Sequence, residues 1–231
     1  QRVWVVAVPC GGGQRSEQLG DLYELGPHVG DRGMEEVQAL WRSSFPLIAD
    51  LLHPGVPWYC FGPQGGDLGL LLLLLKESGL TPRHILIWRK NRPSFSIGRL
   101  DYDYQHEPIV YGWVDGAAHR WYATEPQTSL LEFDRPQASP DHATAKPVPL
   151  LAHLIGNSTR RRDLVLDPFA GSGSILVAAE ETGRVCAAIE IAPQYVDVTV
   201  ARWERLAPGN DGTLIRDGAR YSLADARGLT K

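Results

Sequence analysis

Short apolar runs alternate with helically spaced apolar positions along most of the chain. The runs are typical of buried strands, and the spaced positions are typical of helices with one face in a core. The predicted strands are 3–8, 58–61, 85–88, 164–167 and 185–189. The predicted helices are 34–52, 67–77, 146–155, 175–179 and 193–203. This alternation predicts an α/β fold with a doubly wound sheet and helices on both faces.

The strand that ends at Asp167 is followed by a glycine turn, Gly171-Ser172-Gly173, and then by a helix. Such turns are common loop chemistry, but ligands of open α/β sheets also bind at them. The turn lacks the glycine and lysine patterns of phosphate-binding loops. The carboxylate of Asp167 would repel a phosphate, whereas it suits an ammonium or sulfonium group.

A second carboxylate, Glu190, follows the next apolar run, 23 residues after Asp167. An acid at about this offset is placed to bind a ribose diol. The two acids together describe a nucleoside that carries a positive charge and no phosphate. S-adenosylmethionine fits this description.

These motifs resemble a known family. Asp167-Pro-Phe-Ala-Gly-Ser-Gly173 followed by Ile189-Glu-Ile-Ala-Pro-Gln-Tyr195 is similar to the cofactor motifs of DNA amino-methyltransferases, which methylate adenine N6 or cytosine N4. His142-Ala-Thr-Ala-Lys-Pro147 resembles the family's His-Pro-Thr-x-Lys-Pro box, with Ala143 in place of proline. The box precedes the glycine motif only in the circularly permuted subgroup, and the resemblance runs from about residue 35 to 206.

The resemblance implies a Rossmann-like S-adenosylmethionine-dependent methyltransferase sheet in a single domain, 1–231. It also implies an inserted target-recognition region over 91–140, followed after the last helix by a weakly patterned tail over 207–231. Thr144 and Lys146 are expected near the methionine carboxylate of the cofactor. The expected cofactor residues are Asp167, Phe169, Gly171, Ser172, Gly173, Glu190, Thr144 and Lys146.

Composition adds limits to this interpretation. A chain of 231 residues with 43% hydrophobic content suits one domain with a sizeable core. The leucine run 70–75 is far shorter than the roughly 20 residues of a membrane helix, so it predicts a buried helix and no membrane partner. Three cysteines without paired spacing, and no visible signal peptide, predict a cytoplasmic protein without a metal site. The oligomeric state stays open.

The formal net charge of -4 does not by itself indicate a nucleic-acid partner, but basic residues are clustered. The window 82–100 contains no acid, and a second cluster lies at 160–162. With the resemblance, this predicts double-stranded DNA as partner, with Arg89, Lys90, Arg92 and Arg99 as contacts. Aromatic and polar residues mix between 89 and 140, a pattern that fits either stacking on unpaired bases or a small satellite core.

The slot that corresponds to the family's catalytic motif is Val8-Pro9-Cys10-Gly11, directly after the first predicted strand. The family motif is Asp-, Ser- or Asn-Pro-Pro-Tyr. Its polar side chain and first proline carbonyl hold the target amine, and its aromatic ring stacks on the flipped base. This chain lacks the acceptor, the second proline and the ring. A nucleophilic Cys10, as in cytosine-C5 methyltransferases, lacks the Glu-Asn-Val partner of that group.

Two functions follow from these observations. The first is a site-specific DNA methyltransferase of the restriction-modification type, with adenine N6 favoured over cytosine N4. The second is an inactive descendant that keeps the fold and binds cofactor or DNA. Because Gln1 leads directly into a core strand, we also expect that N-terminal elements of the family are missing.

Overall fold

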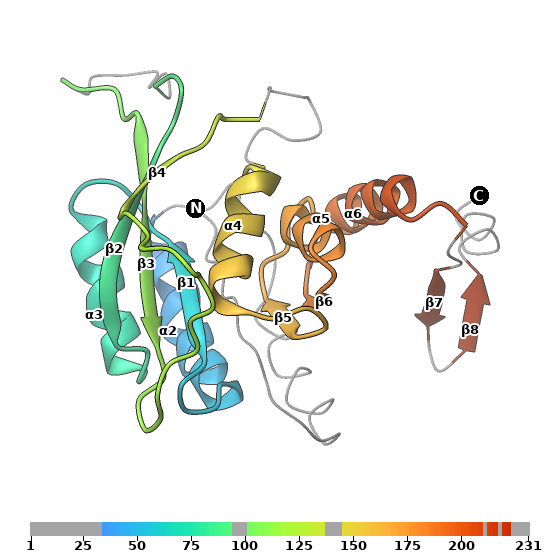
Figure 1. Ribbon diagram of the computed structural model, residues 1–231, viewed down its shortest axis with the longest axis horizontal. Coiled ribbons are helices and arrows are strands. Elements are labelled where there is room, and N and C mark those ends of the chain that lie inside the picture. Colours follow the sequence, from blue (N-terminus) through green and yellow to red (C-terminus); the bar gives the residue numbers. More distant parts are fainter. Residues whose placement is uncertain (1–33, 94–100, 137–144, 210–211, 217–218, 223–231) are drawn as a thin grey trace.

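Strand β1 (Pro57–Phe61) is buried at every position, and the larger sheet is built beside it. The computed structural model describes residues 34–93, 101–136, 145–209, 212–216 and 219–222 (Figure 1). Within these ranges the larger sheet has the order β1-β3-β2-β4. The other strands are β2 (Pro82–Arg89), β3 (His106–Trp113) and β4 (Leu130–Glu132). β3 is antiparallel to both neighbours, and β2 and β4 are parallel.

The position of β3 changes the interpretation of residues 91–140, which the sequence analysis assigned to an insert. β3 lies between β1 and β2, so this part of the range belongs to the central sheet. Its residues from Pro108 to Gly112 are buried on both faces of the sheet. Without an exposed face, the strand has no polar and apolar alternation to mark it in the sequence.

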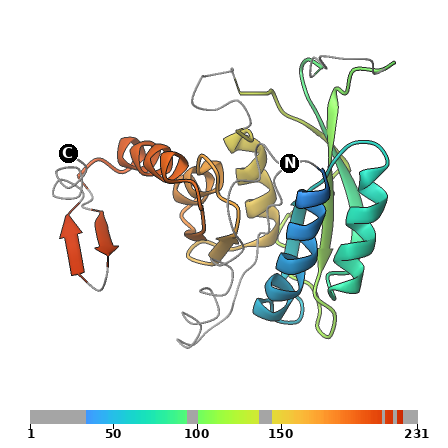
Figure 2. The ribbon, with the colours of Figure 1, turned by 180° about the vertical axis from the view of Figure 1, so that it is seen from behind.

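Helices α2 (Met34–Leu51) and α3 (Asp67–Glu77) cover one face of this sheet, as the two opposite views show (Figures 1 and 2). Trp41, Phe45 and Ile48 of α2 are almost completely buried, and they share one core with Trp58 and Cys60 of β1. The leucine run forms a helix as predicted, but the helix is buried on one face only, and Leu73 is 51% exposed. Its members at 71, 74 and 75 enter the same core.

Helix α4 (Val148–Ser158) covers the opposite face and joins the two parts of the fold. Its side chains Leu150, Leu154 and Ile155 share a core with Tyr59 of β1 and Val165 of the strand at the glycine turn. The hydroxyls of Tyr59 and Ser158 also share a hydrogen bond of 2.7 Å. α4 therefore fixes the glycine turn relative to the larger sheet.

The glycine turn belongs to a second, parallel strand pair, β5 (Leu164–Asp167) and β6 (Val185–Ala188). Helix α5 (Ser174–Glu181) connects them, and α6 (Pro193–Leu206) follows. This order of strand, glycine turn, helix and strand confirms the sequence prediction. The predicted tail contains a separate hairpin of β7 (Thr213–Arg216) and β8 (Ala219–Ser222) (Figure 1).

The first predicted strand, Val3 to Val8, lies outside the described residues. Its expected place beside Leu164 to Asp167, and parallel to it, therefore stays a prediction. In the ranges that the structure describes, no helix is both long and apolar enough to cross a membrane.

Candidate functional site

The turn after β5 is held by its own backbone and by β6. The Phe169 amide donates to the Asp167 carboxylate at 2.9 Å, and the Ile189 amide donates to the Asp167 carbonyl at 2.9 Å. The Ala170 amide donates to the Ile189 carbonyl at 2.9 Å. Asp167 itself is fully buried. The two strand ends and the turn thus form one ordered unit at the edge where ligands of such sheets bind.

Glu190 connects the glycine turn to the end of the second strand. One carboxylate oxygen accepts the Gly171 amide at 2.6 Å, and the other accepts the Ala192 amide at 2.9 Å. A carboxylate has about four acceptor positions, so both oxygens keep capacity for a further donor. Two ribose hydroxyls are donors of the right kind. Glu190 thus fits the predicted role in binding a nucleoside, and it also shapes the loop.

Helix α6 packs directly on the glycine turn. Gly173 has φ 73°, and a Cβ at this position would lie 2.4 Å from Cγ2 and 2.6 Å from Oγ1 of Thr199. Thr199 Oγ1 donates to the Gly171 carbonyl at 3.1 Å. The guanidinium of Arg202 donates to the Ser172 carbonyl at 2.6 Å and to Ser174 Oγ at 3.2 Å. Only glycine fits at residue 173 because the helix approaches this closely.

The sequence analysis did not identify Thr199 and Arg202 as residues of the site. The signal was available. Two polar residues three positions apart lie on one helix face, and the helix directly follows the strand that ends in Glu190. Turn residues Ser172 and Ser174 are almost fully buried beneath that face.

A buried group of charges, which we call the Glu107 cluster, lies where β2 ends and β3 begins. It consists of Lys90, Glu107 and Lys146. The Glu107 carboxylate accepts from Lys90 Nζ at 2.9 Å and from Lys146 Nζ at 2.7 Å. The Lys146 ammonium also lies 5.3 Å from the ring centre of Phe61, and the Lys90 ammonium lies 5.4 Å from that of Trp88.

Burial by itself would raise the pKa of Glu107, but the charges of Lys146 and Lys90 and their hydrogen bonds outweigh it and lower the pKa. Glu107 is therefore an anion in the neutral range. The two ion pairs of Glu107 give this residue a structural role. For Lys146, a contact with the methionine carboxylate of a cofactor stays a prediction.

The structure corrects the predicted role of Lys90 in DNA contact. Its side chain is 4% exposed and paired with Glu107, so it does not present its charge on the protein surface. Arg89 and Arg92 are exposed, and Arg89 pairs with Glu132. Arg99 lies outside the described residues. Neighbouring basic residues such as Arg89 and Lys90 can therefore lie one at the surface and one in the core, because successive residues of a strand face opposite sides of the sheet.

Of the remaining predicted site residues, some lie together around the glycine turn and the others lie outside the described residues. The structure brings together Asp167, Phe169, Gly171, Ser172, Gly173 and Glu190 around one turn. Thr144 and the catalytic slot, Val8, Pro9, Cys10 and Gly11, lie outside the described residues. In the ranges that are described, no group of three or more His, Cys, Asp or Glu residues could hold a metal ion.

Comparisons with known proteins agree with this geometry. A family model described as DNA methylase matches residues 28–201. The Type II methyltransferase M.Cfr9I of Citrobacter freundii is 29% identical over 180 residues, which cover 71% of this chain and 53% of the relative. The Type II methyltransferase M2.MboI of Moraxella bovis is 25% identical over 149 residues, which cover 58% of this chain and 54% of the relative. The chain thus spans about half the length of these curated relatives.

Among solved structures, the chain resembles that of the M1.HpyAVI–SAM complex. The TM-score is 0.63 at 22% identity, and the match covers 74% of this chain and 85% of that one. At this level of identity the likeness concerns the fold. It agrees with the open sheet, the glycine turn and the helices on both faces described above.

Proposed function

The chain belongs to the DNA methylase family, and from that premise we propose that it binds S-adenosylmethionine at the glycine turn and transfers its methyl group to a base amine in double-stranded DNA. The observation that carries the proposal is the position of Glu190, which holds the Gly171 amide while both oxygens keep capacity for further donors. The likeness of the fold to that of the M1.HpyAVI–SAM complex supports the choice of cofactor.

The cofactor supplies a methyl group on a sulfonium, and the chain's residues bind and orient it. Glu190 accepts the ribose hydroxyls. The carboxylate of Asp167 accepts the Phe169 amide, and an acid at this position favours a cationic ligand over a phosphate. Thr199 and Arg202 hold the carbonyls of the turn, so its amides keep a fixed direction. We assign Lys146, with Thr144, to the methionine end of the cofactor.

The proposed DNA partner would approach the carboxyl ends of the strands. Arg92 is exposed beyond the end of β2, where its charge can contact phosphates. Arg89 is also exposed there and could contact phosphates if its ion pair with Glu132 opened. The proposed target atom is adenine N6, with cytosine N4 as the second choice. Part of the 91–140 range, outside β3, is the proposed target-recognition region.

A second candidate function rests on the sequence Val8-Pro9-Cys10-Gly11. An exocyclic amine is a poor nucleophile because its lone pair is delocalised into the ring. An acceptor that holds the N–H bonds localises the lone pair. Val8 has no acceptor and Gly11 has no ring, so a protein that binds cofactor and DNA with little or no methyl transfer is the alternative.

One experiment separates the two functions. The protein is incubated with methyl-labelled S-adenosylmethionine and mixed-sequence duplex DNA, and the DNA is then digested to nucleosides and analysed by mass spectrometry. Labelled N6-methyladenine supports the first function, and labelled N4-methylcytosine would move the target to cytosine. Cofactor binding by calorimetry without any labelled nucleoside supports the second. Neither binding nor transfer would refute both.

The chain also offers a repair variant. Val8→Asp, Cys10→Pro and Gly11→Tyr together rebuild the family motif around Pro9. If the second function holds, this triple variant is expected to gain methyl transfer at unchanged cofactor affinity. The matched control is the triple variant with Glu190→Ala added, which is expected to lose the gain because cofactor capture fails.

A further inference from the structure

A cavity on the α4 side of the larger sheet lies away from the glycine turn and the Glu107 cluster. Its volume is about 290 Å³, near the lower end of ligand pockets, so it suits a small ligand or one unit of a polymer. Trp113 lies beside this cavity at one end of β3, and Glu107 lies at the other. They are six positions apart along the strand, which corresponds to about 20 Å.

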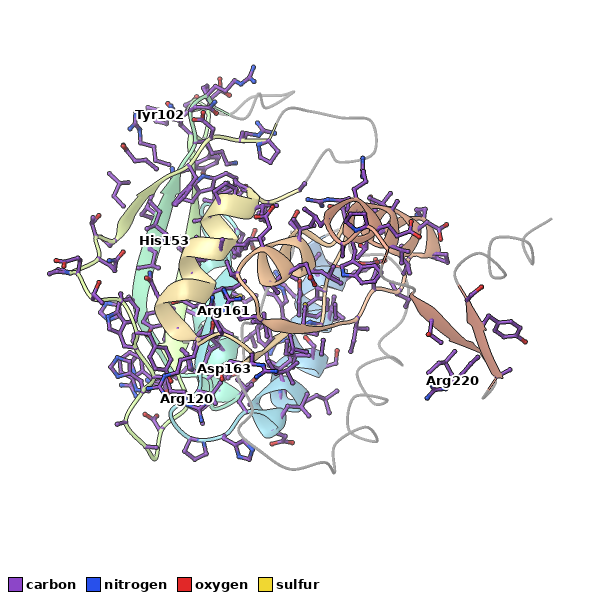
Figure 3. The ribbon with its side chains drawn as sticks, turned by 45° about the vertical axis from the view of Figure 1, so that its right-hand side comes forward. Tyr102, Arg120, His153, Arg161, Asp163 and Arg220 are labelled. Atoms are coloured by element: carbon purple, nitrogen blue, oxygen red, sulfur yellow. The ribbon has the colours of Figure 1, made fainter. Side chains whose placement is uncertain are left out.

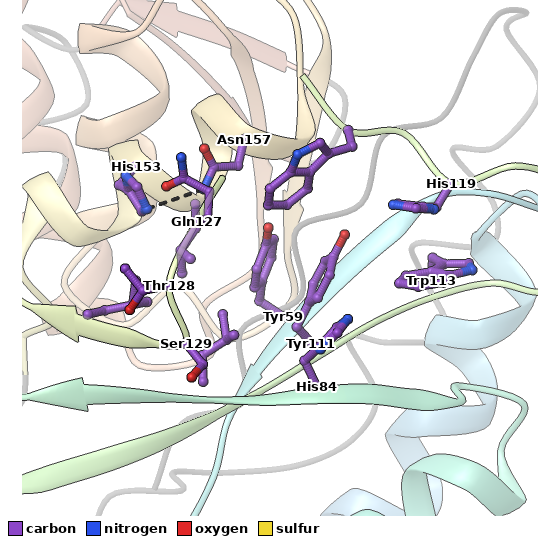
Figure 4. A pocket seen from close by; sticks show the side chains of 14 residues that line it. Tyr59, His84, Tyr111, Trp113, His119, Gln127, Thr128, Ser129, His153 and Asn157 are labelled. Atoms are coloured by element: carbon purple, nitrogen blue, oxygen red, sulfur yellow. Dashed lines mark hydrogen bonds between the residues drawn. The ribbon is translucent and has the colours of Figure 1, made fainter. Parts of the chain in front are cut away.

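Aromatic rings form the base of the cavity and one of its sides. Tyr59 and Tyr111 are almost fully buried and stack at 4.8 Å, and His119 stacks on Trp113 at 4.1 Å. Trp121 is 39% exposed, with its ring 6.1 Å from that of Tyr111. Figure 4 shows the Tyr59 and Tyr111 side chains side by side. Such a surface offers planar faces to another planar ring.

Polar groups line the other side of the cavity. His153 and Asn157 of α4 share a hydrogen bond of 3.2 Å, and Gln127 lies next to them, on the side opposite Trp113 and His119 (Figure 4). Amide and imidazole groups can both donate and accept hydrogen bonds. The buried Tyr111 hydroxyl lies close to Ser158, whose hydroxyl also shares a hydrogen bond with that of Tyr59. A nucleobase is recognised by stacking on its planar face and by hydrogen bonds to its edge, and this cavity offers groups for both.

The second basic cluster of the sequence lies beside this cavity. The Tyr122 amide donates to the Asn157 carbonyl at 2.7 Å, which fixes the loop after Trp121 to the end of α4. The Arg160 guanidinium lies 4.7 Å from the ring centre of Tyr122. Arg161 and Arg162 are exposed next to it. Figure 3 shows Arg161 and Arg120 in the part of the molecule away from Tyr102.

We propose that this surface is a second nucleic-acid site, in which the aromatic cavity takes an unpaired base of single-stranded DNA while Arg160 to Arg162 contact its phosphates. Stacking on aromatic side chains beside a basic track is how proteins bind single strands without reading sequence. The nearby acids cancel only part of the positive charge. Asp115 pairs with Arg83, and Asp163, which accepts the backbone amide of Arg160, offsets one of the three arginine charges. The site is separate from cofactor binding, but it rests on the proposed function in one respect, because His119, Trp121 and Gln127 lie within the range proposed for target recognition.

The test is fluorescence anisotropy with a labelled oligothymidine of about 10 nucleotides, without cofactor, at several salt concentrations. Binding is expected to weaken roughly 5- to 100-fold with Trp121→Ala, because one base loses its stacking partner. Trp121→Phe is expected to keep most of the affinity. Arg160→Ala is expected to weaken binding and to lower the salt dependence by about one counterion.

Arg220→Ala is the matched control. This arginine is exposed on the separate β7–β8 hairpin (Figure 3), and its loss is expected to leave the affinity unchanged. Thermal unfolding of each variant shows that the fold is kept. Oligothymidine affinity that does not change with Trp121→Ala in a folded protein would overturn the proposal. Equal affinity for free thymidine monophosphate, or for an abasic strand of equal length, would also overturn it.

Discussion

Gly173→Ala measures how tightly α6 holds the glycine turn. An L-residue at φ 73° costs roughly 1–2 kcal/mol. The new Cβ would also meet two Thr199 atoms at 2.4 and 2.6 Å, and such overpacking adds about 1–3 kcal/mol. The free energy of unfolding is therefore expected to fall by about 2–5 kcal/mol in urea denaturation.

Gly79→Ala is the control for this prediction. Gly79 has φ 85°, but a Cβ there would meet nothing within 4 Å. It therefore reports the backbone strain alone, about 1–2 kcal/mol. Adding Thr199→Ala to Gly173→Ala removes the two nearest atoms, Cγ2 and Oγ1, but leaves the Thr199 Cβ at 2.9 Å. The double variant is expected to recover about 0.5–3 kcal/mol relative to the additive sum. If Gly173→Ala costs no more than Gly79→Ala, the close approach of α6 is not part of the folded protein.

Three further predictions concern the buried charges and the turn. Glu107→Gln is expected to lower the free energy of unfolding by about 3–5 kcal/mol, since it leaves two buried ammonium groups without their anion. Glu132→Gln in an exposed pair is the control, expected to change it by no more than about 1 kcal/mol. Because the folded pKa of Glu107 is lowered, its contribution is present above the unfolded pKa of about 4.3 and lost as the pH falls through the folded pKa. The difference between wild type and Glu107→Gln in urea denaturation should therefore shrink in acid, and a constant difference would contradict the ion pairs. Arg202→Ala, measured by calorimetry, should weaken S-adenosylmethionine binding more than Arg205→Ala on the exposed side of the same helix.

The sequence predicted best those features that depend on neighbouring residues. The strand ending at Asp167, the turn, α5 and the strand before Glu190 form one continuous segment, and their order alone places the two acids at one edge. The helix periodicity of α2 likewise predicted which of its side chains are buried. The leucine run of α3 predicted the helix but not that Leu73 is exposed. Local patterns were sufficient for these elements because the spacing of apolar residues within one helix or strand indicates which of its faces is buried.

Features that depend on residues far apart in the chain could not be predicted. Lys90 belonged to a basic run, and only the pairing of β2 with β3 brings Glu107 next to it. Tyr111 and Trp113 were assigned to an insert because β3 is buried on both faces and shows no alternation. The contact of Arg202 with Ser172 depends on the packing angle of α6, which no local pattern encodes.

Isothermal titration of S-adenosylmethionine into the wild-type chain and into Glu190→Ala tests the central claim most directly. We expect the wild-type chain to bind S-adenosylmethionine. Glu190→Ala is expected to weaken this binding by about 1–3 kcal/mol, because the hydrogen bonds to the ribose are lost. Glu77→Ala, an exposed acid on α3, is the control and is expected to bind as the wild type does. Equal affinity of Glu190→Ala and the wild type, or no binding by the wild-type chain, would contradict the assignment of this turn as the cofactor site.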